Sequence, residues 1–305
     1  MLIQPYVAIR PSAVDHFNIR GLRYLFRTWG DPDAPLLLCL HGHRDASVTF
    51  QFMADRLTKD WRIVAPDWRG HGDTGWAPHG YYYQDYLADL DAIVDHVSPD
   101  APVAMLGHSL GGNIATVYAG VRPQKVKRFA SIDGFGLRAR DSVEMPDHLR
   151  DWLDAWRRDA SSRVYPNQYA MADRLMAANK RLTRDKALFL ADHTLRQEEG
   201  GYAWSFDPGH QRPFATLYRL EEWAACWKRI EAPALWIAAG DRFDRMDRTG
   251  EGGFEWRLAH IRKGEYVQVP DTGHNIHHDR PEEIARIVDD FFTRDDYDCH
   301  NDLLR

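Results

Sequence analysis

The chain contains 305 residues, of which 44% are hydrophobic and 28% are charged, and its formal net charge is −6. This composition is typical of a soluble globular protein, long enough for one large α/β domain with an inserted subdomain. The acidic balance, with arginines scattered among acidic residues and no basic block, argues against a nucleic-acid partner. No apolar run approaches the ~20 residues of a membrane span, so no membrane association is expected.

The cysteines and the N-terminus predict the compartment. Cys39, Cys226 and Cys299 are odd in number and far apart in the sequence, which indicates a reducing compartment without a disulfide framework. The first six residues have neither the basic segment nor the apolar segment of a signal peptide. We therefore expect a cytoplasmic protein, and the sequence leaves its oligomeric state open.

The N-terminal part of the chain alternates strand and helix signals, as in an α/β domain. Residues 15–29 predict a hairpin that turns at 18–21. The apolar run 36–40 lies between turn residues and is typical of a strand buried on both faces, with Cys39 as a small core residue. Further along, the pattern predicts a helix over 49–57, a strand over 61–65 and an amphipathic helix over 82–97.

The first predicted parallel strand ends in His41-Gly42-His43-Arg44-Asp45. In acyl-transfer enzymes with this layout, one donor to the oxyanion comes from this loop and the second from the residue after the nucleophile. Here these donors are the backbone amides of His43 and Leu110. We expect His41 to brace the loop structurally, whereas His43 and Arg44 either line the mouth of a pocket or are solvated loop residues.

The segment 66–75 is rich in Asp, Arg and His. Such a loop could hold a metal ion or a phosphate. The alternative is a network of ion pairs and hydrogen bonds that holds a long connection in place, and this alternative is favoured. No pair of histidines has the spacing of a His-Glu-X-X-His motif, and no metal or cofactor is expected.

An apolar run over 103–106 enters the turn Gly107-His108-Ser109-Leu110-Gly111, and helix-forming residues follow over 114–119. A Gly-X-Ser-X-Gly turn between a strand and a helix predicts a nucleophile elbow with the serine at a strained apex. Gly107 and Gly111 remove β-carbons that would collide where strand and helix cross. The helix N-terminus then points its amides towards an oxyanion at Ser109. The alternative is a glycine-rich turn with an ordinary exposed serine.

The next predicted strand, 126–132, ends in Asp133-Gly134-Phe135-Gly136, on the rim where open α/β sheets bind ligands. Asp133 could be an acid partner, but local hydrogen bonding in the glycine-rich loop is the favoured role. From 137 to 229 strand signals vanish and the pattern is helical and rich in aromatic residues, which predicts an inserted cap. Most of these aromatics are expected to pack in the cap, with a few facing a substrate cleft.

Strand character returns over 234–239 and 265–269, and a final helix begins at Pro281. The first of these strands leads into Asp241 and the second into His274, so Ser109, Asp241 and His274 follow three strands in that chain order. A serine hydroxyl needs an imidazole to take its proton, and the imidazole needs a carboxylate on its other nitrogen. Asp244 is the alternative acid, and His277 and His278 are less well placed as bases.

Taken together, these motifs resemble the α/β-hydrolase fold of serine hydrolases with a helical cap. The matching stretches are 40–43, 67–72, 107–112, 239–241 and 273–274. The resemblance implies a mostly parallel sheet flanked by helices, with 1–136 and 230–305 as the core and 137–229 as the cap. It also implies Ser109 as nucleophile, Asp241 as acid, His274 as base and the His43 and Leu110 amides as the oxyanion hole. Arg44, His108, Phe135, Trp152 and Trp156 are expected to bind substrate.

The resemblance leaves the reaction open among several activities. The elbow sequence is similar to that of esterases, lactonases, carbon–carbon bond hydrolases and cofactor-free haloperoxidases, whereas an aspartate would be expected for haloalkane dehalogenases and epoxide hydrolases. Carboxylic-ester hydrolysis of a small-molecule substrate is the leading hypothesis. A carbon–carbon or lactone substrate is the alternative within the enzyme class. A ligand-binding protein that keeps the triad without using it is the alternative outside that class.

Overall fold

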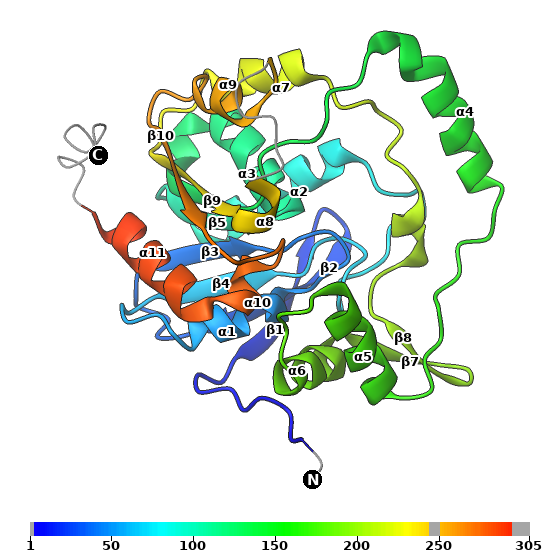
Figure 1. Cartoon of the computed structure of the whole chain (residues 1–305). Coiled ribbons are helices and arrows are strands. Elements are labelled where there is room, and N and C mark those ends of the chain that lie inside the picture. The colour runs from blue at the N-terminus through cyan, green and yellow to red at the C-terminus, as the bar shows by residue number, and fades with distance from the viewer. Residues whose placement is uncertain (1–2, 244–250, 295–305) are drawn as a thin grey trace.

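The computed structural model describes residues 3–243 and 251–294. Its centre is an eight-stranded sheet in the order β1-β2-β4-β3-β5-β6-β9-β10, with helices packed around it (Figure 1). The strands are β1 (Ala13–Ile19), β2 (Leu22–Trp29), β3 (Leu36–Leu40), β4 (Arg62–Pro66), β5 (Val103–His108), β6 (Val126–Ile132), β7 (Leu195–Glu198), β8 (Gly201–Trp204), β9 (Ala234–Ala239) and β10 (Gly264–Val269). The α-helices are α1 (Gln51–Ala54), α2 (Tyr83–Val97), α3 (Leu110–Val121), α4 (Met145–Trp156), α5 (Gln168–Ala178), α6 (Arg184–Thr194), α7 (Leu220–Trp227), α8 (Gly240–Phe243), α9 (Phe254–Leu258), α10 (Ile276–Asp279) and α11 (Pro281–Thr293).

The sheet is mostly parallel, as predicted. All pairings from β4 through β3, β5, β6 and β9 to β10 are parallel. The antiparallel pairings are those of β2, which runs opposite to both of its neighbours, β1 and β4. The first hairpin turns at Arg20 and Gly21, whose positive φ values of 47° and 85° fit the turn predicted there. Because the parallel strands end at one edge, the loops that follow them meet above that edge.

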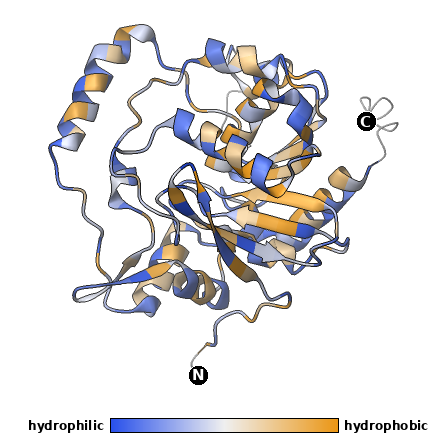
Figure 2. Cartoon of the chain, turned by 180° about the vertical axis from the view of Figure 1, so that it is seen from behind, coloured by the Kyte–Doolittle hydropathy of each residue, from blue (hydrophilic) through white to orange (hydrophobic). Residues whose placement is uncertain are grey.

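The central strands are buried on both faces, and Figure 2 shows them as an apolar band across the molecule. Successive side chains point to opposite faces, so Met105 belongs to the cluster with α2, α3 and α7, and Leu106 to the cluster with α1 and α11. The continuous apolar runs of the sequence therefore form the middle layer of a three-layer structure. Within the described ranges, no helix has the length and apolarity needed to cross a bilayer.

The segment after β6 contains the helices α4, α5 and α6 outside the sheet, but it is not all helical. Leu195–Glu198 and Gly201–Trp204 form an antiparallel hairpin that turns at Glu199 and Gly200, where Gly200 has a positive φ of 83°. Expecting no strands here was wrong, because strands of four residues are too short to produce a clear alternating pattern. At the other end, α7 packs against α3 and its Trp227 is fully buried in the main core. The side chains around α7 are therefore part of the core.

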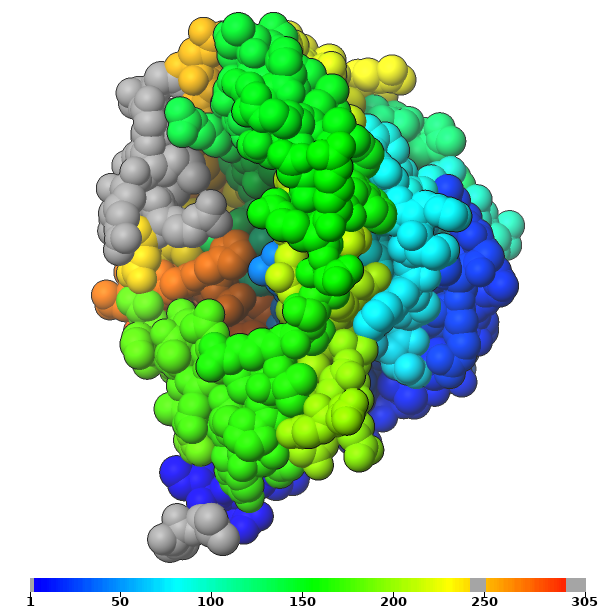
Figure 3. Space-filling model, turned by 90° about the vertical axis from the view of Figure 1, so that its right-hand side faces the viewer, coloured from blue at the N-terminus to red at the C-terminus, as the bar shows by residue number. Residues whose placement is uncertain are grey.

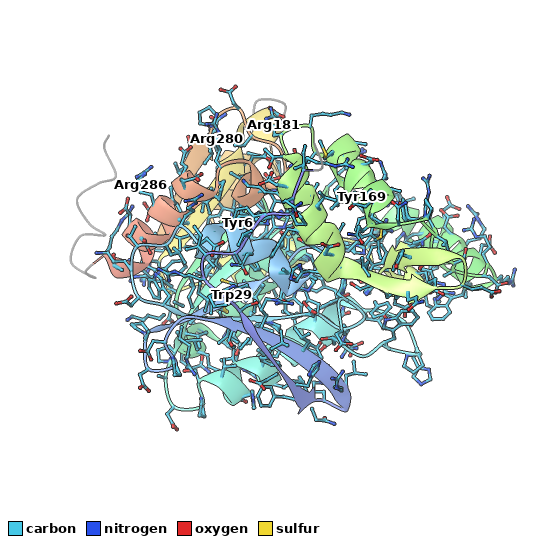
Figure 4. The ribbon with its side chains drawn as sticks, turned by 90° about the horizontal axis from the view of Figure 1, so that it is seen from below. Tyr6, Trp29, Tyr169, Arg181, Arg280 and Arg286 are labelled. Atoms are coloured by element: carbon cyan, nitrogen blue, oxygen red, sulfur yellow. The ribbon has the colours of Figure 1, made fainter. Side chains whose placement is uncertain are left out.

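The chain before β1 ties the cap helices to the core. The Tyr6 amide donates to the Asp185 carbonyl at 3.0 Å, and the Tyr6 hydroxyl donates to Asp55 at 2.8 Å. The ring of Tyr6 lies edge-on to Phe52 in α1 and to Phe189 in α6, with centroid distances of 5.0 and 5.8 Å. Figure 4 shows Tyr6 beside these helices. One aromatic side chain thus links the core to the cap.

The loop after β4 is held by ion pairs and hydrogen bonds, as the favoured interpretation predicted. Arg69 contacts the Asp89 carboxylate through Nε at 2.5 Å and Nη2 at 2.8 Å, and Tyr24 donates to the same carboxylate. Asp67 accepts hydrogen bonds from the Ser47 and Asp73 amides at 2.6 and 3.2 Å. These charged groups are buried, so each is compensated by a partner.

His41 braces the loop after β3, as predicted. Its Nε2 accepts a hydrogen bond from the Trp68 amide at 2.8 Å, its Nδ1 lies 2.7 Å from the Gly42 carbonyl, and its own carbonyl accepts from Trp68 Nε1 at 2.9 Å. The imidazole is fully buried. Burial disfavours the charged form and lowers the pKa of His41 to about 4.

This pKa shift predicts a loss of stability in acid. Between the ordinary histidine pKa and about pH 4, His41 is protonated in the unfolded chain but neutral in the folded protein. The free energy of unfolding therefore falls as pH falls through this window. We expect His41→Asn to be less stable at neutral pH, but with a free energy of unfolding that falls less steeply on acidification, by up to about 1.4 kcal/mol per pH unit. Urea unfolding between about pH 7 and pH 4.5 measures how steeply the free energy of unfolding depends on pH in the wild type and in His41→Asn. His79→Asn, at an exposed position, serves as the control, and an unchanged slope in His41→Asn would contradict the argument.

Candidate active site

Ser109 lies at the apex of a tight turn between β5 and α3. Its backbone has φ 50° and ψ −111°, a region that non-glycine residues rarely adopt. The Ser109 amide donates to the Ile132 carbonyl at 2.9 Å, which fixes the turn to β6. A β-carbon at Gly107 would lie 2.4 Å from the Gly112 nitrogen, and one at Gly111 would lie 2.1 Å from the Leu40 oxygen. Both positions require glycine, as the sequence pattern predicted.

His274 lies over this turn, in the loop between β10 and α10. Its Nε2 is 2.9 Å from Ser109 Oγ, and its Nδ1 is 2.5 Å from Oδ2 of Asp133. A carboxylate only accepts hydrogen bonds, so Nδ1 carries the proton and Nε2 is left to accept the serine proton. The Gly273 amide donates to Asp279 at 2.9 Å and holds the loop. This array can generate an oxygen nucleophile at Ser109.

The carboxylate on His274 belongs to Asp133, and the prediction of Asp241 is wrong. Asp241 forms a two-pronged ion pair with Arg181 of the cap, with distances of 3.0 and 3.1 Å. The reason lies in the sheet register: His108 pairs with Ile132, so Asp133 is beside Ser109, whereas Asp241 follows β9, one strand further away. Asp244, the alternative acid, lies outside the described residues.

Asp133 shows further signs of a constrained position. Its φ is 50°, its side chain is only 8% exposed, and its amide donates to the Ile237 carbonyl at 2.9 Å. The sequence did contain a signal, because an aspartate followed by glycine at the end of a buried strand lies at the ligand-binding edge of such a sheet. The favoured prediction of local hydrogen bonding for Asp133 is therefore wrong, because its carboxylate reaches His274 Nδ1.

The two predicted oxyanion donors flank the turn through their backbone. Leu110 is the first residue of α3, where an amide has no carbonyl partner within the helix. His43 follows Gly42, and a β-carbon at Gly42 would lie 3.3 Å from Cβ of Ser109. The loop after β3 therefore lies directly against Ser109, on the sheet edge where both amides are found.

A cavity of about 410 Å³ contains Ser109 and His274. Figure 3 shows the molecule hollowed on this side, between the cap and the C-terminal part of the core. Arg44 and His108 line the cavity from the core, as predicted. The cap supplies a largely apolar wall that the sequence analysis did not identify, made of Leu175, Leu182, Leu190, Trp204 and Phe206.

Three aromatic residues predicted to bind substrate lie elsewhere. Trp152 and Trp156 line a separate, much smaller space with Tyr81. Phe135 is buried in the core, with its ring 4.2 Å from that of Trp236. The predictions were wrong because aromatic content does not reveal which way a cap helix faces: α4 lies at the outer edge of the cap (Figure 1).

The cavity also holds charged groups. Arg44 has a positive φ of 59°, donates to the His210 carbonyl at 3.1 Å and lies over the Phe206 ring. Arg174 of α5 is exposed, and among the described residues it has no ion pair or hydrogen bond. Burial raises the pKa of Asp45, on the cavity wall, to about 6. The charge facing the cavity is thus positive on balance.

A group of histidines adjoins the cavity at His43, His71 and His210, close enough for one ion to reach a nitrogen of each. The ring of His71 is already fully used: Nε2 accepts from the Arg44 amide at 3.0 Å, and Nδ1 lies 3.0 Å from the Arg69 carbonyl. Burial lowers the pKa of His210 to about 3, so its imidazole is neutral at pH 7. The group serves to position Arg44.

A sequence model of the α/β-hydrolase fold matches residues 35–281. The chain belongs to this family. It is 26% identical over 276 residues to a serine hydrolase-like protein of Danio rerio, covering 87% of this chain and 83% of the relative. It is also 28% identical over 284 residues to a 3-hydroxybutyrate-oligomer hydrolase of Cupriavidus necator, covering 89% and 93% of the two chains.

Among solved structures, this α/β-hydrolase is similar to the thioesterase domain from the curacin biosynthetic pathway. The TM-score is 0.79 at 24% sequence identity, and the match covers 91% of this chain and 99% of that domain. This likeness supports the fold. The family match identifies the chain as a hydrolase of the α/β type.

The geometry predicts which acid matters for turnover. We expect Asp133→Asn to lower kcat by roughly 10³-fold or more, because the amide no longer fixes the His274 tautomer or stabilises its imidazolium. Asp241→Asn, the matched control, should stay within a few-fold of the wild type because it removes only the pair with Arg181. Steady-state measurement of kcat for the two variants shows which of the two aspartates is needed for turnover. Equal losses, or a loss confined to Asp241→Asn, would reject Asp133 as the partner of His274.

Proposed function

We propose that this α/β-hydrolase is a serine carboxylesterase with a Ser109–His274–Asp133 triad. The observation that carries the proposal is the continuous hydrogen-bond array from Asp133 through His274 to Ser109 Oγ, at the apex of the elbow. His274 takes the serine proton as Oγ attacks the ester carbonyl, and Asp133 stabilises the imidazolium that forms. His274 then gives the proton to the leaving alcohol, and water releases the acid from the acyl-enzyme by the same route.

The His43 and Leu110 amides complete the mechanism in this proposal. Both belong to backbone segments next to Ser109, which supports a role as donors to the carbonyl oxygen as it becomes negative. Loss of a single donor of this kind costs about 10²–10³-fold in kcat in serine hydrolases. The N-terminal end of α3 adds a positive dipole end in the same place.

The lining of the cavity supports an acyl group of small or medium size. Its volume of about 410 Å³ and its wall of leucines, Trp204 and Phe206 favour an apolar chain. Arg44 and Arg174 favour a carboxylate further along the substrate. The Cupriavidus necator relative is named for oligomers of 3-hydroxybutyrate, which are esters with a carboxylate at one end. An acidic ester therefore fits both the cavity and the relative.

Two alternatives use the same residues differently. Lactones and carbon–carbon bonds next to a carbonyl can be attacked through the same triad, and the arginines also suit the acidic substrates of such reactions. A ligand-binding role would require the Ser109–His274 pair to be idle, although the two atoms are already at hydrogen-bond distance. Ester hydrolysis needs only the triad and the two backbone amides, and the Ser109–His274 hydrogen bond favours it over a binding role.

A series of 4-nitrophenyl esters of increasing acyl length tests the proposal. Wild-type protein should hydrolyse the shorter members, and Ser109→Ala should lose activity by several orders of magnitude because triad residues act as a unit. The rate should fall once the acyl chain exceeds the cavity. Wild type no faster than Ser109→Ala across the series would reject the esterase activity and direct the search to lactone and carbon–carbon substrates.

The arginines predict a preference for an acidic acyl group. The mono-4-nitrophenyl ester of glutarate and 4-nitrophenyl pentanoate have acyl chains of equal carbon number and differ in the terminal carboxylate. We expect Arg174→Gln to lower kcat/KM for the glutarate ester by about 3- to 10-fold, since an exposed ion pair is worth about 1 kcal/mol. The pentanoate ester is the internal control and should be unaffected. An equal change in kcat/KM for both esters would show that Arg174 does not bind the substrate carboxylate.

A further inference from the structure

Behind Ser109 lies a second group of potential metal ligands, Asp45, His108 and His277. One ligand atom from each lies within 4.8 Å of the others. His108 is the residue before Ser109 and is 2% exposed, while His277 is in α10 and fully buried. The triad mechanism proposed above uses none of these three side chains. Their proximity therefore needs a separate explanation.

His108 presents an unused lone pair. Its Nε2 lies 3.0 Å from the His274 carbonyl oxygen, and a carbonyl can only accept, so Nε2 carries the ring proton. Nδ1 then holds a lone pair, and no described residue forms a hydrogen bond with it. The nearest carboxylate oxygen, Oδ2 of Asp45, is 4.0 Å away, too far for a hydrogen bond.

His277 is in the same situation. Its Nε2 is 2.9 Å from the Thr49 hydroxyl, which is also 2.6 Å from His278 Nε2 and adjoins the Asp45 carboxylate. A hydroxyl has one proton, so Thr49 donates to the nearer imidazole nitrogen, His278 Nε2, and accepts a hydrogen bond from His277 Nε2. His277 Nδ1 is then left with a lone pair, also without a partner among the described residues.

Two buried imidazole lone pairs next to a carboxylate form an electron-rich site in which no described residue donates a hydrogen bond to either nitrogen. The geometry points to a binding site for one transition-metal ion, held by His108 Nδ1, His277 Nδ1 and the Asp45 carboxylate. Two imidazoles and a carboxylate are a ligand set suited to Zn²⁺. Asp45 and His108 also line the cavity, so the fourth ligand position is expected to face it.

The site must contract to close around an ion, by up to about 1.5 Å at its widest pair, because its donor atoms lie within 4.8 Å of one another. Bonds of about 2.0–2.1 Å in tetrahedral geometry place donor atoms roughly 3.3 Å apart. The 4.0 Å between His108 Nδ1 and Asp45 Oδ2 exceeds this by less than an ångström. The other histidine group cannot compete in the same way, because both nitrogens of His71 are already engaged.

Direct Zn²⁺ binding to the full chain tests this inference, which is independent of the proposed esterase activity. After treatment with EDTA and removal of the chelator, calorimetric titration of the wild type should give one equivalent with micromolar or tighter affinity. His277→Gln should weaken binding at least 10-fold, because one of three ligands is lost. His210→Gln alters the other histidine group and should bind as the wild type does. Ser109→Ala should also bind normally, so a failed esterase proposal leaves this test intact.

The melting temperature gives a second measurement. Zn²⁺ should raise it for the wild type and for His210→Gln, but not for His277→Gln. If His277→Gln does not fold, Asp45→Asn takes its place in both measurements with the same expected loss. Absence of a saturable equivalent in the wild type, or equal affinity in the wild type and the ligand variants, would overturn the metal site.

Discussion

The close approach of three backbone segments at the β5–α3 turn is the constraint on which the site depends. Leu40 at the end of β3 comes so near to Gly111 that a β-carbon there would meet its carbonyl oxygen at 2.1 Å. The contact leaves Ser109 in a positive-φ conformation that costs about 1–3 kcal/mol. Burial of α3 between the sheet and α2 and α7 offsets that cost, because its Ile114 and Tyr118 lie in the main core. Once the turn is formed, the positions of the loops that follow β3 and β6 are largely fixed by their contacts with it.

The sequence locates the sheet strands and the Ser109–His274 pair because their signals are local. Apolar runs bounded by turn residues locate β3, β6 and β9 to the residue, and the strand–turn–helix pattern locates Ser109. The acid is different, because Asp133 and Asp241 both follow buried strands that end at the same sheet edge. Only the order of strands and the partner of each carboxylate separate them, and neither is encoded locally. The prediction that Trp152 and Trp156 bind substrate is wrong for a similar reason, since the orientation of α4 depends on tertiary packing.

Polar contacts attach the cap to the part of the core that holds His274. Arg181, in the loop between α5 and α6, pairs with Asp241 after β9. In the same loop, Asn179 Nδ2 donates to Asp279 at 2.7 Å, and Asp279 also accepts from the Gly273 amide. Arg181 is labelled in Figure 4, close to the C-terminal helices. The cap wall of the cavity is therefore fixed through the loop that carries His274.

This arrangement separates two tasks that a single aspartate could not perform at once. A carboxylate that holds the His274 ring must remain buried and aimed at Nδ1, as Asp133 is with 8% of its side chain exposed. A carboxylate that anchors the cap must face outward to reach an arginine, as Asp241 does with 38% exposed. Placing the first task on β6 leaves the end of β9 free for the second. The cap contacts the His274 loop through Asp279 and Gly273, while the hydrogen bond between His274 and Asp133 stays within the core.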